Sequence, residues 1–252
     1  MNDVVKDSIA SPALVVEGLV VEREKNGECF TLEVPRLAVC PGRILAVVGQ
    51  SGCGKSTLLD ALALVLPASD SQVFTLYPDT KEAVDLAEAG QKTLAAVRGR
   101  DMGYVLQSGG LLSFLSVKEN ILLPGLLLGM PGDLLRSRLK ALAERLDIAG
   151  QLHKKPQHLS GGQRQRAAIV RALAHCPRIV FADEPTAAVD EQTAGDIFAV
   201  FRQIVLELGT ALVVVSHDLG LVRRFADDIF TFELSKYGCN VASVLKQTEL
   251  AA

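Results

Sequence analysis

A glycine-rich segment early in the chain has the residue types needed to hold a phosphate group. Residues 49–57 fit the pattern Gly-x-x-x-x-Gly-Lys-Ser/Thr. Glycines let backbone N–H groups turn toward an anion, and the start of the following helix adds partial positive charge. Lys55 is suited to reach the β- and γ-phosphates of a nucleotide, and the hydroxyl of Ser56 to bind Mg²⁺. The predicted phosphate site comprises Gly49, Gln50, Ser51, Gly52, Cys53, Gly54, Lys55, Ser56 and Thr57.

Two adjacent acids end an apolar run later in the chain. Residues 178–184 read Arg-Ile-Val-Phe-Ala-Asp-Glu, which places Asp183 and Glu184 at the end of a predicted strand. Ligands of α/β proteins gather at the carboxyl edge of the sheet. Asp183 is suited to hold Mg²⁺ there, often through water, and Glu184 to orient or deprotonate an attacking water. The alternative is a pair of solvated acids, which the phosphate motif makes far less favourable.

A third segment, residues 159–163, reads Leu-Ser-Gly-Gly-Gln and precedes a predicted helix. Ser160 is a helix-capping residue type, and the glycines and the helix start could form a second anion site. From these residues alone, an ordinary helix cap is the better interpretation.

Two single polar residues follow other predicted strands. Gln107 comes after residues 103–106, and His217 comes after residues 211–216. Gln107 could contact Mg²⁺ or the attacking water, and His217 could donate a hydrogen bond to a γ-phosphate. A lone histidine is more often a packed or solvated residue, and Gln107 could simply be a surface amide.

The elements that must position these residues alternate between strands and helices. Continuous apolar strands alternating with helices indicate an α/β protein with a mainly parallel sheet, buried on both faces. A helical stretch interrupts this order, with apolar residues at helical spacing between Leu134 and Leu146. The patterns predict strands at 14–21, 30–34, 43–48, 72–76, 103–106, 179–182 and 211–215, and helices at 55–67, 81–96, 162–175 and over most of 117–152.

Composition limits the class of protein. The chain has 252 residues, 26 Lys and Arg against 29 Asp and Glu, and a net charge of −3. This balance does not indicate a nucleic-acid partner. The five cysteines include no Cys-x-x-Cys pair, so a disulfide framework or zinc site is not expected and a reducing compartment fits best. We expect no signal peptide in residues 1–12, and the sequence has no run of about 18 apolar residues that could span a bilayer.

Together, these segments resemble the nucleotide-binding domain of ABC (ATP-binding cassette) transporters. Leu-Ser-Gly-Gly-Gln with Arg164 and Arg166 beyond it, in a chain that also has the phosphate motif, is very specific to that family. The resemblance covers nearly the whole chain. It implies one P-loop NTPase (RecA-like) domain, residues 1–252, with a mainly parallel α/β core, an N-terminal antiparallel β part and an inserted α-helical subdomain. The core would comprise residues 12–107 and 159–240, and the helical signature subdomain about 108–158.

The resemblance also implies a mechanism. Two copies would dimerise head to tail over two ATP molecules, each bound by the phosphate loop of one copy and the signature segment of the other. Glu184 would be the catalytic base, His217 would position the γ-phosphate, Gln107 would contact Mg²⁺ and the attacking water, and Asp190 would communicate across the dimer. The signature residues facing the partner's ATP would be Ser160, Gly161, Gly162 and Gln163.

The implied second partner is a separate membrane permease, with this chain attached peripherally at the cytoplasmic face. Residues 111–124 would help form the groove for the permease, because Leu111, Leu112, Phe114 and Leu115 suit an apolar partner surface. They could equally belong to the helical core. The strings at 117–124 and 182–186 resemble the lipoprotein-release and macrolide-efflux group, whose permeases have few membrane helices and a large extracytoplasmic domain.

Three features depart from the family pattern. An aromatic residue normally stacks on adenine, yet residues 22–27 contain none. Phe30 could substitute, although its alternation with polar neighbours marks it as a core strand residue. The residues before Asp190 lack the usual Ser or Gly, and residues 68–96 do not match the usual pattern of strands and turns.

Two other functions remain as alternatives. A soluble ABC ATPase acting on DNA or ribosomes is disfavoured, because the chain has one cassette and no sustained heptads between Lys55 and Asp183. A non-hydrolysing regulatory subunit is disfavoured by the presence of Lys55, Asp183 and Glu184.

Overall fold

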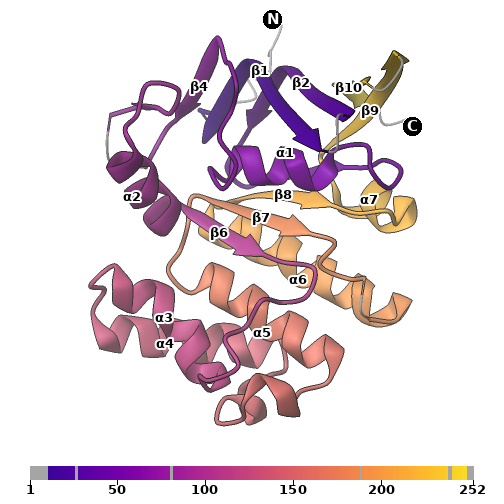
Figure 1. Cartoon of the computed structure of the whole chain (residues 1–252). Coiled ribbons are helices and arrows are strands. Elements are labelled where there is room, and N and C mark those ends of the chain that lie inside the picture. Colours follow the sequence, from indigo (N-terminus) through magenta and orange to yellow (C-terminus); the bar gives the residue numbers. More distant parts are fainter. Residues whose placement is uncertain (1–10, 26–27, 80–81, 188, 238–239, 249–252) are drawn as a thin grey trace, which may run out of the picture.

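The residues that the structure describes form one sheet of ten strands with helices on both faces (Figure 1). The computed structural model describes residues 11–25, 28–79, 82–187, 189–237 and 240–248. The strand order is β5-β4-β1-β2-β10-β9-β3-β8-β7-β6. The strands are β1 (Leu14–Lys25), β2 (Glu28–Val39), β3 (Ile44–Val47), β4 (Val73–Leu76), β5 (Val84–Asp85), β6 (Met102–Val105), β7 (Ile179–Asp183), β8 (Ala211–Val215), β9 (Asp228–Tyr237) and β10 (Asn240–Thr248).

The parallel half of the sheet runs from β9 through β3, β8 and β7 to β6. Every residue of β3 and β8 is buried, and only the last residue of β7 is partly exposed. Unbroken apolar strands are typical of parallel sheets covered on both faces, so the predicted α/β fold is confirmed.

The other half of the sheet is mainly antiparallel. β1 pairs with both β2 and β4, and β4 pairs with β5. The exception is β10, which pairs antiparallel with β9 but parallel with β2 and so joins the two halves. Both β1 and β2 are longer than predicted, because their ladder continues through the charged residues at 22–25 and, on β2, through 28–29 and 36–39.

Different helices cover the two faces of the sheet. On one side lies α1 (Lys55–Leu62), whose Leu58 and Leu59 pack in one core with Val47. On the other side lie α5 (Gly161–Leu173) and α6 (Glu191–Leu208), in a core shared with Val214 (Figure 1). The predicted helix at 55–67 ends early, at Leu62, and Leu64 then takes a left-handed φ of 60°.

The predicted helical stretch at 117–152 contains α3 (Val117–Leu127), α4 (Gly132–Arg145) and the short 3₁₀ helix η1 (Ala149–Gln151). A second 3₁₀ helix, η2 (Pro156–His158), follows it, and α7 (Leu219–Phe225) lies near the end of the chain. In Figure 1 α3, α4 and α5 form a layer on the side of the sheet opposite α1. Within the described ranges, no helix is long and apolar enough to cross a bilayer.

The predicted helix at 81–96 is correct only for residues 91–96, which belong to a helix that continues to Asp101. Within its described part, Val84 and Asp85 form β5 and pair with β4, and α2 (Gln91–Asp101) begins only after Gly90. The N–H of Leu86 donates to the carbonyl of Phe74 at 2.7 Å, and the Leu86 side chain is buried. Pairing with β4 therefore overrides the helical preference of the Ala, Glu and Leu residues in this segment.

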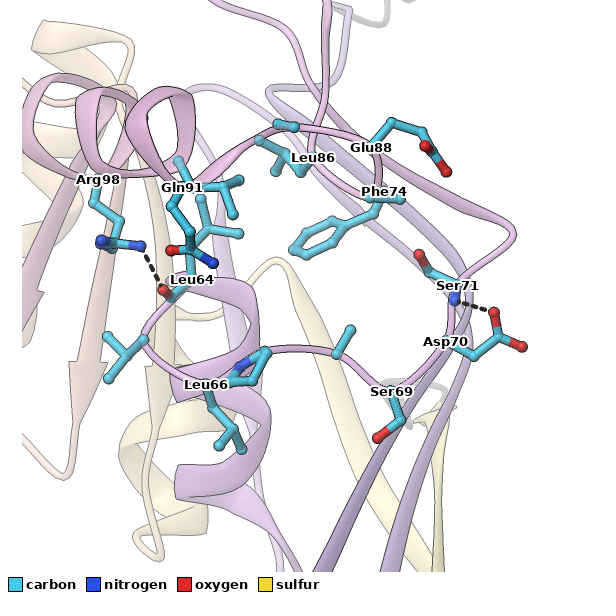
Figure 2. Close-up of a pocket in the computed structure, with 16 residues that line it drawn as sticks. Leu64, Leu66, Ser69, Asp70, Ser71, Phe74, Leu86, Glu88, Gln91 and Arg98 are labelled. Carbon is cyan, nitrogen blue, oxygen red and sulfur yellow. Dashed lines mark hydrogen bonds between the residues drawn. The ribbon is translucent and has the colours of Figure 1, made fainter.

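The same segment lines a cavity of about 690 Å³ between the end of α1 and α2 (Figure 2). Phe74 and Leu86 form its apolar wall, and Arg98 donates a hydrogen bond to the carbonyl of Leu64 at its edge. None of the residues 49–57 lines this cavity.

Candidate functional site

The glycine-rich segment forms a turn between β3 and α1 that aims backbone groups inward. Gly52 and Gly54 have φ angles of 81° and 104°, which disfavour residues with a Cβ atom. Gly54 caps the start of α1, and a Cβ atom there would lie 2.8 Å from Cζ of Phe30. A strand, a glycine turn and a helix start in this order create a concavity for an anion.

Lys55 lies inside this turn. Its ammonium group donates to the backbone carbonyls of Gly49 and Gln50, both at 2.9 Å, and its side chain is buried. The loop therefore closes around a positive charge, which complements the negative charge of a polyphosphate.

Ser56 and Asp183 bring the phosphate loop and β7 together. The Ser56 hydroxyl donates to Oδ2 of Asp183 at 2.9 Å. Burial raises the pKa of Asp183 above its ordinary value, and the hydrogen bond from Ser56 only partly opposes this effect. A half-buried carboxylate beside a hydroxyl is a pair of hard oxygen ligands, the type that Mg²⁺ prefers.

Glu184, which follows Asp183 at the end of β7, has a left-handed backbone. Its φ is 45°, unusual for a residue other than glycine, and its N–H donates to the carbonyl of Val215 on β8 at 3.1 Å. Left-handed backbone at a residue with a Cβ atom is costly and often marks a functional position. The two adjacent acids have different partners, since Asp183 accepts from Ser56 and Glu184 accepts from Gln107.

The Glu184 carboxylate meets two other predicted site residues. Nε2 of Gln107 donates to Oε2 of Glu184 at 3.1 Å. Nδ1 of His217 lies 3.6 Å from the same oxygen, and the His217 side chain is mostly exposed. The structure therefore gathers residues from the ends of β6, β7 and β8, three adjacent parallel strands. An acid held between an amide and an imidazole can orient or deprotonate a water molecule.

The signature segment lies apart from the phosphate loop. Ser160 caps α5 in a capping box, in which its hydroxyl accepts from the N–H of Gln163 and the Gln163 side chain accepts from the N–H of Ser160. Helix α5 lies on the sheet face opposite α1 (Figure 1). No hydrogen bond between the described residues joins Ser160 to residues 49–57.

The signature segment contacts the turn before Asp190. A Cβ atom on Gly162 would lie 3.1 Å from Cγ1 of Val189. Asp190 caps α6, accepting from the N–H of Thr193 at 3.0 Å and from its hydroxyl at 2.7 Å. These bonds lower the pKa of Asp190, so its carboxylate stays ionised at neutral pH.

One contact of the phosphate loop has no sequence signal. The fully buried Ser243 on β10 donates its hydroxyl hydrogen bond to the carbonyl of Cys53 at 2.6 Å. The contact of Phe30 with Gly54 is partly foreseeable, since the sequence marks Phe30 both as a core residue and as an aromatic near the nucleotide.

The sheet order, the glycine turn with its enclosed lysine and the two acids at the end of β7 define a P-loop nucleoside triphosphatase. Residues 32–187 match the family model described as ABC transporter. The lipoprotein-releasing system ATP-binding protein LolD of Maricaulis maris is 40% identical over 82% of this chain and 87% of its own length. The chain belongs to the ABC transporter family, and it is an ATP-binding and ATP-hydrolysing subunit of that family.

Other relatives agree with this assignment. The macrolide export ATP-binding/permease protein MacB 1 of Aeromonas hydrophila is 35% identical over 75% of this chain, which corresponds to 28% of MacB 1. The ATP-binding cassette MJ0796, solved as a dimer bound to ADP and Pi, is 27% identical, with a TM-score of 0.78 over 95% of this chain and 99% of its own. These findings confirm the predicted resemblance to the lipoprotein-release and macrolide-efflux group.

Proposed function

We propose that two copies of this chain close over two molecules of Mg-ATP and that hydrolysis drives a separate membrane permease. The observation that carries the proposal is the convergence of Lys55, the Ser56–Asp183 pair and the Gln107–Glu184–His217 cluster around one phosphate loop. The chain would act at the cytoplasmic face of the membrane as a peripheral subunit.

The metal ligands in this proposal are Ser56, Asp183 and Gln107. The Ser56 hydroxyl already lies 2.9 Å from the Asp183 carboxylate, and both carry the oxygen atoms that Mg²⁺ favours. When bound, Mg²⁺ supplies positive charge that offsets the charge developing on the phosphate oxygens.

The roles of the other residues follow from their positions. Residues 49–57 hold the phosphates through backbone N–H groups, and Lys55 holds their negative charge. Glu184 orients and deprotonates the attacking water, with Gln107 and His217 fixing its carboxylate from two sides. The His217 side chain is 67% exposed, so it is free to reach the γ-phosphate.

A second copy accounts for the separation between the phosphate loop and the signature segment. Ser160 is exposed at the start of α5, on the sheet face opposite the phosphate loop. A helix N-terminus with a serine and two glycines binds anions, but none of this chain's own phosphate-binding residues contacts it. In a head-to-tail dimer Ser160 and Gly162 would contact the ATP bound by the partner, and Asp190 would lie at the dimer contact.

An apolar groove between α2 and α3 is the proposed contact with the permease. Leu112, Leu123, Leu127 and Leu128 line it, and Leu127 is 79% exposed. Phe114, nearby in sequence, is 71% exposed, whereas Leu111 packs against the core. Asn120 is fully buried and bonds both the N–H and the carbonyl of Leu112, which fixes the segment that follows Gln107.

The groove lies where a helical subdomain would join the core. We propose that residues of about 108–158 form that subdomain and that 12–107 and 159–240 form the core. By likeness to LolD and MacB, the permease would belong to the lipoprotein-release and macrolide-efflux group.

The variant Glu184→Gln tests the catalytic part of the proposal. It keeps the size of the side chain but cannot accept a proton, so we expect ATP binding to persist, phosphate release to fall at least about a hundredfold and an ATP-bound dimer to accumulate. Phosphate release and size-exclusion chromatography with ATP and Mg²⁺ measure the two effects. The matched control is Glu207→Gln, an exposed acid on α6 paired with Arg145. Unchanged ATP turnover in Glu184→Gln would show that Glu184 is not the catalytic base.

A further inference from the structure

The sheet order gives the bound nucleotide a direction. The phosphate loop follows β3, with β8, β7 and the catalytic acids on one side and β9, β10, β2 and β1 on the other. Glu184, Gln107 and His217 lie together on the first side, where the proposed function places the reacting phosphate. The nucleoside must therefore extend toward β2 and β1.

Phe30 lies at that second side. It is half-buried on β2, and its ring sits so close to Gly54 that a Cβ atom there would lie 2.8 Å from Cζ. Phe30 thus packs against Gly54 at the start of α1, beside the phosphate loop.

Arg23 on β1 is directly opposite Phe30 in the antiparallel ladder. Opposite residues share a face of the sheet, and so do residues two positions apart on one strand. The two preceding pairs of this row, Val21 with Leu32 and Leu19 with Val34, are fully buried in the core that contains Leu58 and Leu59 of α1. Arg23 therefore continues the α1-facing row beyond its buried part.

The guanidinium of Arg23 is available to a ligand. The side chain is exposed, and in the described part of the chain no hydrogen bond or ion pair holds it. Its neighbours Glu22 and Glu24 alternate to the opposite face. In Figure 1 the end of β1 lies beside the start of α1, in agreement with the contact between Phe30 and Gly54.

We propose that the adenine of ATP stacks on the guanidinium of Arg23, with Phe30 closing the inner edge of the base site. A guanidinium is planar, delocalised and weakly hydrated, so it stacks well on aromatic rings. This assignment rests on the proposed function, and it explains how a chain without an aromatic residue at 22–27 holds the base. Stacking forms no hydrogen bonds with the edge of the base and therefore does not distinguish adenine from guanine, so GTP should bind about as well as ATP.

Binding of ADP and of inorganic pyrophosphate to the full chain, measured by calorimetry, tests the assignment. Neither probe is hydrolysed by this site, and only ADP carries the base. Arg23→Ala should weaken ADP binding by about 2- to 30-fold and change pyrophosphate binding less than about 2-fold. Arg23→Tyr removes the charge but restores a plane, so its ADP affinity should return to that of the unmodified chain.

The matched control is Arg36→Ala, because Arg36 is an exposed arginine on β2 paired with Glu17. It should leave both affinities unchanged. Wild-type ADP affinity in Arg23→Ala would overturn the assignment. So would equal losses for ADP and pyrophosphate without recovery in Arg23→Tyr, since Arg23 would then act through charge alone. If the unmodified chain binds neither probe, or if Lys55→Ala binds both normally, the proposed function itself fails.

Discussion

Gln107 and Glu184 are joined by a hydrogen bond of 3.1 Å between the side-chain amide and the carboxylate. The bond links the ends of the adjacent parallel strands β6 and β7. Residues beyond Gln107 lead directly to Leu112 and the groove proposed for the permease. A displacement of that segment would therefore change the surroundings of the proposed catalytic base. A movement at the groove could thus alter ATP hydrolysis through the contact between Gln107 and Glu184.

Replacing the enclosed lysine tests the phosphate loop. Lys55→Ala removes the ammonium that bonds the carbonyls of Gly49 and Gln50, so we expect the loss of most ATP binding and of ATPase activity. Binding of a fluorescent ATP analogue measures the first effect. Lys140→Ala, at an exposed position on α4, serves as the control and should bind as the unmodified chain does. Normal affinity in Lys55→Ala would refute the phosphate site.

Ser160 has two possible roles, a helix cap and a ligand of the partner's ATP. A charged and a neutral substitution at this position distinguish between the two roles. Asp and Asn both cap helices as well as Ser does, so Ser160→Asp and Ser160→Asn should keep the thermal midpoint within about 2 °C. Asp also adds a negative charge that faces the γ-phosphate in the proposed dimer. We expect Ser160→Asp to lose at least about tenfold in ATPase activity relative to Ser160→Asn.

The readouts for Ser160 are thermal unfolding without nucleotide and phosphate release with Mg-ATP. Mixing Ser160→Asp with Lys55→Ala subunits adds a second check, because a composite site would give one intact site in each mixed dimer. Equal activities of the Asp and Asn variants would mean that Ser160 is only a cap.

The sequence predicts this site best where the functional residues are contiguous. The glycine turn with Lys55, and the acids that follow an apolar strand, depend on local patterns that also fix their place at the sheet edge. Gln107 and His217 are predictable only through the family resemblance, because their meeting at Glu184 requires the order of three strands. No pattern in the sequence encodes that order.

Local patterns fail where distant pairing decides the conformation. Val84–Asp85 have helix-forming neighbours, yet pairing with β4 makes them a strand. The predicted strand at 14–21 ends before the charged residues at 22–25, yet the ladder with β2 continues through them and places Arg23 opposite Phe30. Both differences come from tertiary contacts that outweigh intrinsic propensity.

The burial of His175 predicts that the free energy of unfolding depends on pH. Its Nε2 lies 3.1 Å from the carbonyl of Met102, and burial lowers its pKa below the ordinary value of 6.5. The unfolded chain therefore binds a proton here at a higher pH than the folded chain does. As pH falls through 6.5, His175 reduces the free energy of unfolding by up to about 1.4 kcal/mol per pH unit.

His175→Gln removes this titration and keeps a donor for the Met102 carbonyl. Denaturant unfolding at several pH values between 8 and about 5 should show a shallower loss of stability in the variant than in the unmodified chain. Parallel curves for the two proteins would mean that His175 titrates alike in the folded and unfolded states.

The hydrogen bond from Ser243 to the carbonyl of Cys53 spans 190 positions of the chain. It ties the phosphate loop to β10, which also pairs with β2 beside Phe30. During synthesis, the loop and its lysine leave the ribosome long before Ser243 exists. The nucleotide site of this chain therefore cannot reach its final form until β10 has been made, and a nascent chain halted before β10 should lack it.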